Sequence, residues 1–303
     1  IYTRQIIWKR CSFILMRVTI IIPTFKNFDY LKLCISSIEK NSTYQHQIIV
    51  HINGEDKKTE NFLLKKKIEF TKSFINIGLC SGVNIAAKKS MTEYIMYSHD
   101  DMYYLPSWDN YIKSEIKKLD TKYFYLSLTH ISYMPAVKGD LQHITYNCGN
   151  DLESFNEDKL LLNYNKFQFR DLQGSHWAPH IIHKDIWDKV GGFSEEFNPG
   201  FASDPDLNMK LWNVGVRIFK GLSRSRVYHF GSITTRKNKN VIKNNGKKTF
   251  LLKWKCTVEF FTKHYLKRGS TYYTPLINPK KNFLFYFDLF LSKSKFYITK
   301  YLK

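Results

Sequence analysis

The stretch "YIMYSHDDMYYLPSWD", residues 94–109, ends a short apolar segment on two adjacent carboxylates. Residues 94–97 predict a buried strand. Asp100 and Asp101 follow, with aromatic residues on both sides. A solvated turn would explain an arbitrary Asp-Asp pair, but carboxylates enclosed by apolar surface need a cation or hydrogen bonds. The stretch therefore indicates a divalent cation site at a strand end, and Mg²⁺ or Mn²⁺ suits oxygen ligands.

The residues around this stretch predict an α/β fold. The run "VTIII" at 18–22 is apolar and β-branched, as in a central parallel strand that is buried on both faces. Asn27 is a candidate N-cap for the helix that follows. Alternation of strands and helices predicts an open, mostly parallel sheet with helices on both faces, in which ligands bind beyond the carboxyl ends of the strands. Further strands are expected at 47–52, 68–74, 123–130, 216–219 and 226–230, and helices at 81–89, 185–193 and 203–215. Residues 138–170 are expected to form a long loop with short elements.

Composition narrows the compartment and the class of protein. The 303 residues suffice for one large domain with a smaller appendage. The five cysteines are widely spaced and form no CxxC, which argues against a disulfide framework or a zinc site and favours a cytoplasmic protein. The apolar runs fall short of the roughly 18 residues that span a bilayer. Residues 1–15 are expected to be an extension that precedes the fold.

The positive charge is concentrated at the carboxyl end of the chain. Of the net charge of +21, residues 236–303 contribute +15, with 17 Lys and Arg against two acids. This excess predicts an anionic partner, with a membrane surface favoured over nucleic acid. Residues 283–302 interleave Phe and Tyr with Lys, which is typical of a peripheral segment on the cytoplasmic face of an anionic membrane. A helix packed on the rest of the protein, with Lys outside, explains the same pattern. Residues 236–248 are expected to be a flexible basic loop.

Four segments together resemble the family 2 glycosyltransferases, which are inverting enzymes of the GT-A fold. They are "VTIIIPTFKN", "NIGLCSGVNIAAKKSMTEYIMYSHDDM", "GGFSEEFNPGFASDPDLNMKLWNVGVRIFKG" and "VYHFGS", in the family's order and spacing over about residues 17–232. The resemblance implies a GT-A catalytic domain at 16–235, followed by a basic, aromatic extension at 236–303. It also implies a nucleotide-diphosphate sugar donor, a glycan or lipid-linked acceptor, a divalent metal, and a role in cell-surface polysaccharide synthesis.

The resemblance also assigns roles to the residues of the metal and donor sites. Asp101 would be the main metal ligand, Asp100 would contact the ribose or the metal shell, and His99 stands where the family has Asp. His229 would complete the metal shell, although a structural role explains a lone His equally well. The residues that would bind the nucleotide sugar are Pro23, Thr24, Phe25, Glu55 or Asp56, Asn76 and Gly78. A strand end at Pro23 and a plain Gly turn at Gly78 are the simpler explanations.

An inverting transfer needs a general base. The resemblance implies that Asp204 is this base, with Ser203 in place of the family's Glu and with Asp206 as the rival. Local sequence offers another role, because Asp204 precedes Pro205 as an N-cap precedes a first helical Pro. Trp177 and His180 are candidates for an acceptor platform, against core packing for Trp177 and a surface loop for His180.

Two other classes of function remain open at this stage. The departures at His99 and Ser203 fit a catalytically inactive protein that binds sugar nucleotides on the same fold. A basic nucleic-acid-binding protein would use the Lys-rich end and aromatic stacking. That second class leaves Asp100, Asp101 and Asp204 without a role, since clustered acids repel phosphates unless a metal intervenes.

Overall fold

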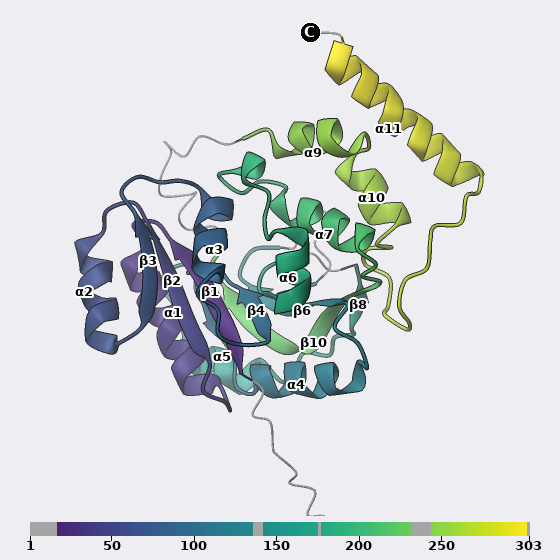
Figure 1. The fold of residues 1–303 in the computed structure, drawn as a ribbon. Helices are drawn as coiled ribbons and strands as arrows, with labels where there is room; N and C mark the ends of the chain where they lie inside the picture. Colours follow the sequence, from purple (N-terminus) through teal and green to yellow (C-terminus); the bar gives the residue numbers. More distant parts are fainter. Residues whose placement is uncertain (1–16, 136–141, 175–176, 232–243, 302–303) are drawn as a thin grey trace, which may run out of the picture.

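A mixed, mostly parallel sheet runs through the centre of the protein (Figure 1). The computed structural model describes residues 17–135, 142–174, 177–231 and 244–301. Across the sheet the strands are β3 (Glu69–Ser73), β2 (Gln47–Asn53), β1 (Val18–Thr24), β4 (Tyr94–Tyr97), β9 (His180–His183), β6 (Phe124–Ser132), β10 (Ile218–His229) and β5 (Met102–Tyr104). β7 (His143–Thr145) pairs with β6, and β8 (Leu172–Gln173) pairs with β10. β9 is antiparallel to both of its neighbours, and β5 is antiparallel to β10. The predicted α/β fold class is confirmed.

Helices cover both faces of this sheet. Figure 1 shows α3, α6 and α7 above the sheet and α1 and α4 below it. The helices that precede β10 in the chain are α1 (Phe28–Asn41), α2 (Lys57–Lys66), α3 (Leu79–Ala87), α4 (Trp108–Lys118), α5 (Glu157–Asn163), α6 (Lys184–Val190), the 3₁₀ turn η1 (Glu195–Phe197) and α7 (Ser203–Asn213). The central strands are apolar because both of their faces are covered, and every residue of β6 is buried.

The strands predicted at 18–22, 47–52, 68–74, 94–97 and 123–130 are present as β1, β2, β3, β4 and β6. The two strands predicted at 216–219 and 226–230 are one strand, β10, whose pairing with β6 is irregular between Leu222 and Arg226. Asp171 accepts hydrogen bonds there from the backbone and the hydroxyl of Ser223, which keeps this irregular segment within the sheet.

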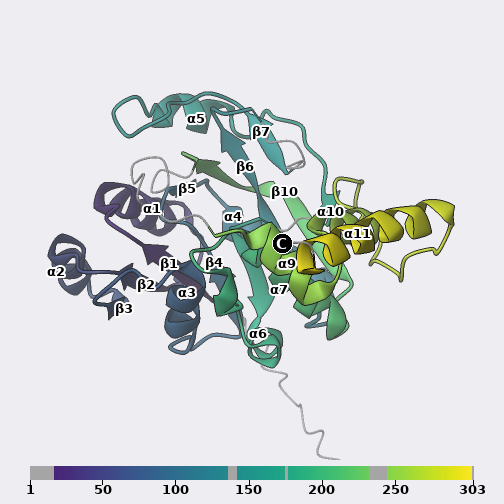
Figure 2. The same cartoon turned by 90° about the horizontal axis from the view of Figure 1, so that it is seen from above.

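Three further helices follow β10 in the chain. They are α9 (Gly246–Trp254), α10 (Val258–His264) and α11 (Phe283–Tyr301), which pack on one another beside α7 (Figure 2). The extension predicted at 1–15 and residues 236–243 of the predicted basic loop lie outside the described residues, and residues 246–248 already belong to α9. No helix within the described ranges is both long enough and apolar enough to cross a membrane.

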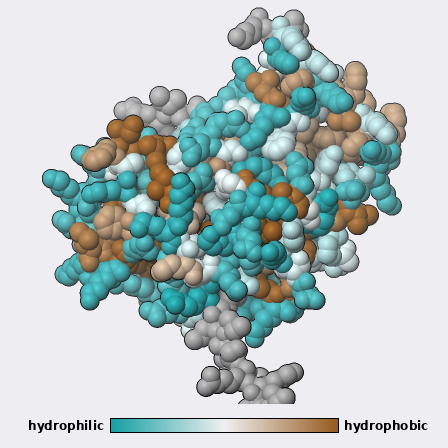
Figure 3. Space-filling view, in the orientation of Figure 1, coloured by the Kyte–Doolittle hydropathy of each residue, from teal (hydrophilic) through white to brown (hydrophobic). Residues whose placement is uncertain are grey.

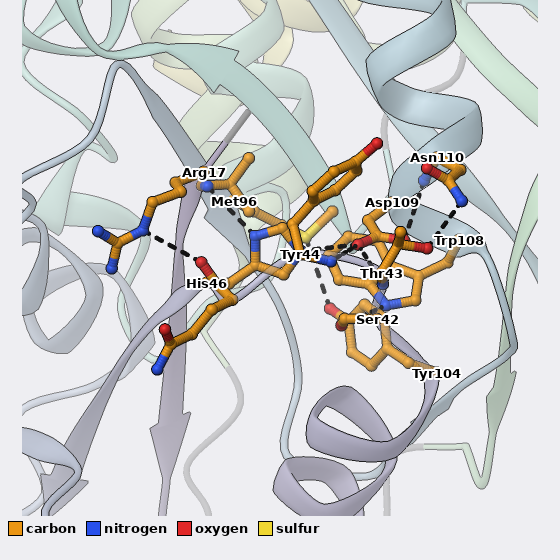
Figure 4. Close-up of polar contacts among 12 residues, drawn as sticks. Arg17, Ser42, Thr43, Tyr44, His46, Met96, Tyr104, Trp108, Asp109 and Asn110 are labelled. Atoms are coloured by element: carbon orange, nitrogen blue, oxygen red, sulfur yellow. Dashed lines mark hydrogen bonds and ion pairs between the residues drawn. The ribbon is translucent and has the colours of Figure 1, made fainter. Parts of the chain in front are cut away.

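A buried carboxylate joins α4 to the loop between α1 and β2 (Figure 4). Oδ2 of Asp109 accepts hydrogen bonds from the backbone N–H groups of Thr43 and Tyr44, at 2.7 and 2.9 Å, and from Nε2 of His46 at 3.2 Å. Nδ1 of His46 accepts from the backbone N–H of Val18, so the ring proton is on Nε2. Burial raises the pKa of Asp109, but the hydrogen bonds outweigh it and hold the pKa below its usual value. The cluster therefore fixes the amino end of β1 relative to α4.

We expect Asp109→Ala to lower the free energy of unfolding by about 2–5 kcal/mol, because it leaves buried donors without their acceptor. The measurement is urea denaturation at neutral pH. Since the folded pKa of Asp109 is depressed, its stabilisation is present above the unfolded pKa of about 4 and is lost as pH falls through the folded value. The difference between the two proteins should therefore shrink in acid. Asp120→Ala, at an exposed position just beyond α4, is the control and should stay within about 0.5 kcal/mol. An equal loss in both variants would refute the anchoring role.

Candidate active site

The carboxyl ends of β1 and β4 meet at Asp100. Its two carboxylate oxygens accept hydrogen bonds from the Thr24 hydroxyl at 2.7 Å and from Nδ2 of Asn27 at 3.0 Å. Asn27 stands at the N-cap position of α1, as predicted, but its side chain makes no cap hydrogen bond there and donates to Asp100 instead. Burial, and then the charge of Asp101, raise the pKa of Asp100 to about 7. Asp100 thus fixes the turn that follows β4.

Asp101 faces two imidazoles on the other side of this turn. Its Oδ1 lies 3.3 Å from Nε2 of His229 and 3.9 Å from Nδ1 of His99. β5 and β10 bring this about, because Met102 pairs with His229 and the N–H of Phe230 donates to the carbonyl of Asp101. One ligand atom from each of the three side chains lies within 4.8 Å of the others. We call His99, Asp101 and His229 the His-Asp-His cluster.

This cluster has the donor set of a transition-metal site. Burial lowers the pKa of His99 to about 4, although the charge of Asp101 opposes the shift, so the ring is neutral and keeps a lone pair. Two imidazole nitrogens with one carboxylate oxygen suit Mn²⁺ better than Mg²⁺, which prefers oxygen ligands alone. The residues present therefore fit a divalent metal. Asp100 lies outside the cluster and fixes the turn that carries His99 and Asp101, through its hydrogen bond from Thr24.

Asp204 lies in the first turn of α7. The predicted N-cap role of Asp204 is wrong, because α7 begins at Ser203 and the residue at the cap position is Ala202. The reason is a turn in which both the backbone N–H and the hydroxyl of Ser203 donate to the carbonyl of Gly200. Within the described part of the chain, Oδ1 of Asp204 accepts no hydrogen bond. Burial raises the pKa of Asp204 to about 7, while its side chain stays 21% exposed.

Tyr97 and His180 connect Asp204 to the His-Asp-His cluster. The Tyr97 ring makes T-shaped contacts with the rings of His99 and His180, with centroids 5.4 and 5.3 Å apart. Nδ1 of His180 in turn lies 4.0 Å from Oδ1 of Asp204. The two groups of side chains therefore lie at the same end of the sheet. His180 is fully buried and lies behind Asp204, not on a surface that an acceptor would reach. Trp177 is only partly buried, and its acceptor role stays a prediction.

Asp206, the rival candidate for the base, is bound by two side chains of α9. It is fully buried, and its Oδ1 accepts a hydrogen bond from Nε1 of Trp254 at 2.8 Å. The same oxygen lies 2.9 Å from Nζ of Lys253, which also pairs with Glu196. These contacts fasten α9 to α7 and give Asp206 a structural role.

The residues expected to bind the nucleotide base lie around the ends of β1 and β2. Phe25 is partly exposed beside Gly54, where a Cβ would lie 3.4 Å from the ring. Pro23 still belongs to β1 and pairs with His51 of β2. Asp56 caps α2 by accepting from the backbone N–H and the hydroxyl of Thr59.

Glu55 is exposed beside Asp56, so it is the better placed of the two for a ligand. The donor-binding prediction for Asn76 and Gly78 remains untested, but their geometry explains the glycine. Gly78 has a φ of +87°, and a Cβ there would lie 2.4 Å from Oδ1 of Asn198. That oxygen accepts from the N–H of Cys80 at the start of α3, and Oδ1 of Asn76 accepts from the N–H of Gly78.

Sequence reasoning missed three features of the site. It treated His99 as a departure from a carboxylate motif, although its position two residues before Asp101 was the signal for a mixed nitrogen and oxygen site. It assigned no role to Tyr97, because an aromatic residue at the end of a buried strand is ordinary core. It gave no partner to Asp206, because Lys253 and Trp254 lie in a distant part of the chain.

Comparison with known proteins places the chain among glycosyltransferases. The family model described as "Glycosyl transferase family 2" matches residues 19–187. No curated protein matches the sequence. Similar solved structures include TarS 1-349 of S. aureus (TM-score 0.53, 13% identity, 71% of this chain and 60% of that one). GalNAc-T7 "with UDP, GalNAc and Mn2+" is also similar (TM-score 0.54, 13% identity, 72% and 44%).

TarS 1-349 "in complex with UDP-GlcNAc" is similar as well, with a TM-score of 0.52, 14% identity and coverage of 72% and 61%. At these identities the likeness shows the fold, and this chain spans about 60% of TarS 1-349 and less than half of GalNAc-T7. The family model, in contrast, matches more than half of the chain and includes β1, α3, β4 and the HDD motif. The chain therefore belongs to glycosyl transferase family 2 and has the GT-A fold.

Proposed function

We propose that this glycosyltransferase moves a sugar, with inversion, from a uridine-diphosphate sugar to a glycan or lipid-linked acceptor, and that it acts in cell-surface polysaccharide synthesis. The observation that carries the proposal is the connection of the His-Asp-His cluster through Tyr97 and His180 to Asp204. The bound ligands of the similar structures, UDP-GlcNAc in TarS and UDP with Mn²⁺ in GalNAc-T7, support the choice of nucleotide and metal.

In this proposal His99, Asp101 and His229 hold Mn²⁺. When bound, the ion neutralises the negative charge that develops on the departing diphosphate. Thr24 and Asn27 hold Asp100, and Asp100 holds the turn that places Asp101 beside the two imidazoles that would bind the ion. Phe25 offers a partly exposed ring on which the nucleotide base stacks.

Asp204 is the general base of the proposed reaction. A base works best with a pKa near the operating pH, and burial raises the pKa of Asp204 to about 7. His180 does not counteract this shift, because burial lowers its own pKa to about 3 and keeps it uncharged beside the carboxylate. The carboxylate can then accept the proton of an acceptor hydroxyl from the exposed side of its side chain.

We expect Asp204→Asn to reduce turnover roughly 10²–10⁴-fold, which is the usual contribution of a general base. The free energy of unfolding should change by less than about 1 kcal/mol, since the amide has the same shape and the carboxylate makes no cap hydrogen bond. Donor affinity should be unchanged. Transfer assays and urea denaturation on the same preparation test this, and near wild-type turnover would remove Asp204 from the mechanism.

Asp206→Asn is the contrasting variant, two residues along the same helix. It removes one of the two ionic partners of Lys253, the buried one, and should lower the free energy of unfolding by about 2 kcal/mol. Turnover per folded molecule should fall less than in Asp204→Asn. If the two variants exchange these phenotypes, Asp206 is the base and Asp204 is structural.

We expect Asp101→Asn to weaken Mn²⁺-dependent binding of UDP at least tenfold, or about 1.4 kcal/mol. His229→Gln should weaken binding with Mn²⁺ more than with Mg²⁺, because it removes one of the two nitrogen ligands that favour the transition metal. Isothermal titration calorimetry with each metal measures both effects, and Asp120→Asn is the control. Equal affinity in wild type and Asp101→Asn would place the metal elsewhere.

A further inference from the structure

The last helix of the described chain presents an apolar surface to solvent. α11 runs from Phe283 to Tyr301, and only Phe285, Ser292 and Phe296 are buried in it. Nine apolar or aromatic side chains of the helix are between 48% and 85% exposed. They are Phe283, Leu284, Tyr286, Phe287, Phe290, Leu291, Tyr297, Ile298 and Tyr301. Figure 3 shows tan and brown residues at the upper right, where Figure 1 places this helix.

These nine side chains form one continuous surface. With 3.6 residues per turn, they cover an arc of roughly 160° of the helix surface, in which Ser294 is the one polar residue. We call these nine residues, with Ser294, the outer face of α11. An exposed apolar surface that is continuous along a whole helix marks a site of interaction.

The opposite side of α11 is firmly attached, so the outer face points away from the protein. The Phe285 ring packs against Phe260 and His264, with centroids 5.3 and 5.2 Å apart. Asp288 pairs with Lys263 at 2.6 Å and with His264 at 2.7 Å. The Ser292 hydroxyl accepts from the backbone N–H of Thr257 at 2.7 Å. Because Asp288 is the only acid of the helix and is already paired, it adds no negative charge to the outer face.

Lysines border the outer face. At 3.6 residues per turn, Lys293 and Lys300 fall on one edge and Lys295 on the other. Lys280 and Lys281 precede the helix. Lys is suited to this position at a lipid interface, because its stem covers apolar surface while its ammonium group reaches the headgroups.

We propose that the outer face of α11 lies in the surface of an anionic lipid membrane, parallel to the membrane plane, with the lysines on phosphate headgroups. The charge pattern favours this occupant over a second copy of the chain. Two outer faces in contact would bring positive edges together on molecules that each carry a net charge of +21. The proposal depends on this surface alone and not on glycosyl transfer.

The test is co-sedimentation of the whole chain with vesicles of phosphatidylcholine, with and without phosphatidylglycerol. The wild type should sediment with the mixed vesicles and remain largely in solution with phosphatidylcholine alone. Phe290→Glu combined with Ile298→Glu should reduce the fraction bound at least tenfold, about the effect of removing two apolar anchors. Both side chains point to solvent, at 66% and 55% exposure, so the melting temperature should stay near that of the wild type.

Leu162→Glu is the matched control, since it places a charge at an equally exposed apolar position on α5, and it should sediment like the wild type. Lys293→Glu with Lys300→Glu should bind weakly and lose the preference for phosphatidylglycerol. Binding of the Phe290 and Ile298 double variant at wild-type level would overturn the proposal, as would a wild type that stays in solution with both vesicles. Light scattering gives the remaining outcome: a wild-type dimer that the double variant converts to monomer would make the outer face a contact between copies.

Discussion

The site depends on how the protein accommodates two adjacent carboxylates at the end of a buried strand. The two oxygens of Asp100 accept hydrogen bonds from Thr24 and Asn27, at the end of β1. Asp101 instead lies beside His99 and His229. The two carboxylates thus have different partners, and burial, together with the charge of Asp101, raises the pKa of Asp100. One carboxylate thus fixes the geometry of the turn, and the other lies between two imidazoles.

The main strands were predictable because each of them is a run of consecutive, mostly apolar residues. The apolar runs that became β1, β2, β4 and β6 need no tertiary information to be recognised. β5 and β9 could not be predicted in the same way, since β5 has only three residues, β9 has a His at each end, and both are defined by antiparallel pairing with distant strands. These two short strands are the ones that bring His229 and His180 to the site, so the sheet was foreseeable and the completion of the site was not.

The cap hydrogen bonds expected of Asn27 and Asp204 are both missing, and the cause is the same. Asn27 and Asp204 both have the residue type and the local context of an N-cap, and local sequence does not show which groups arrive from elsewhere. Asp100 competes successfully for the Asn27 amide, and the turn at Gly200 and Ser203 starts α7 one residue before Asp204. A carboxylate freed from capping keeps a raised pKa, which is what the proposed base requires.

The basic extension that begins at residue 236 differs in composition from the rest of the chain, but in the folded protein it contacts the helix that carries Asp204. Lys253 and Trp254 of α9 both bind Asp206, which lies two residues after Asp204 on α7. α11 packs on α9 and α10, and its inner side is fixed by Asp288 and Phe285. The outer face of α11 is therefore connected to α7 by the packing of α9 and α10 and by the ion pair between Lys253 and Asp206. If that face rests on a membrane, the same contacts set the orientation of the active site relative to the membrane surface.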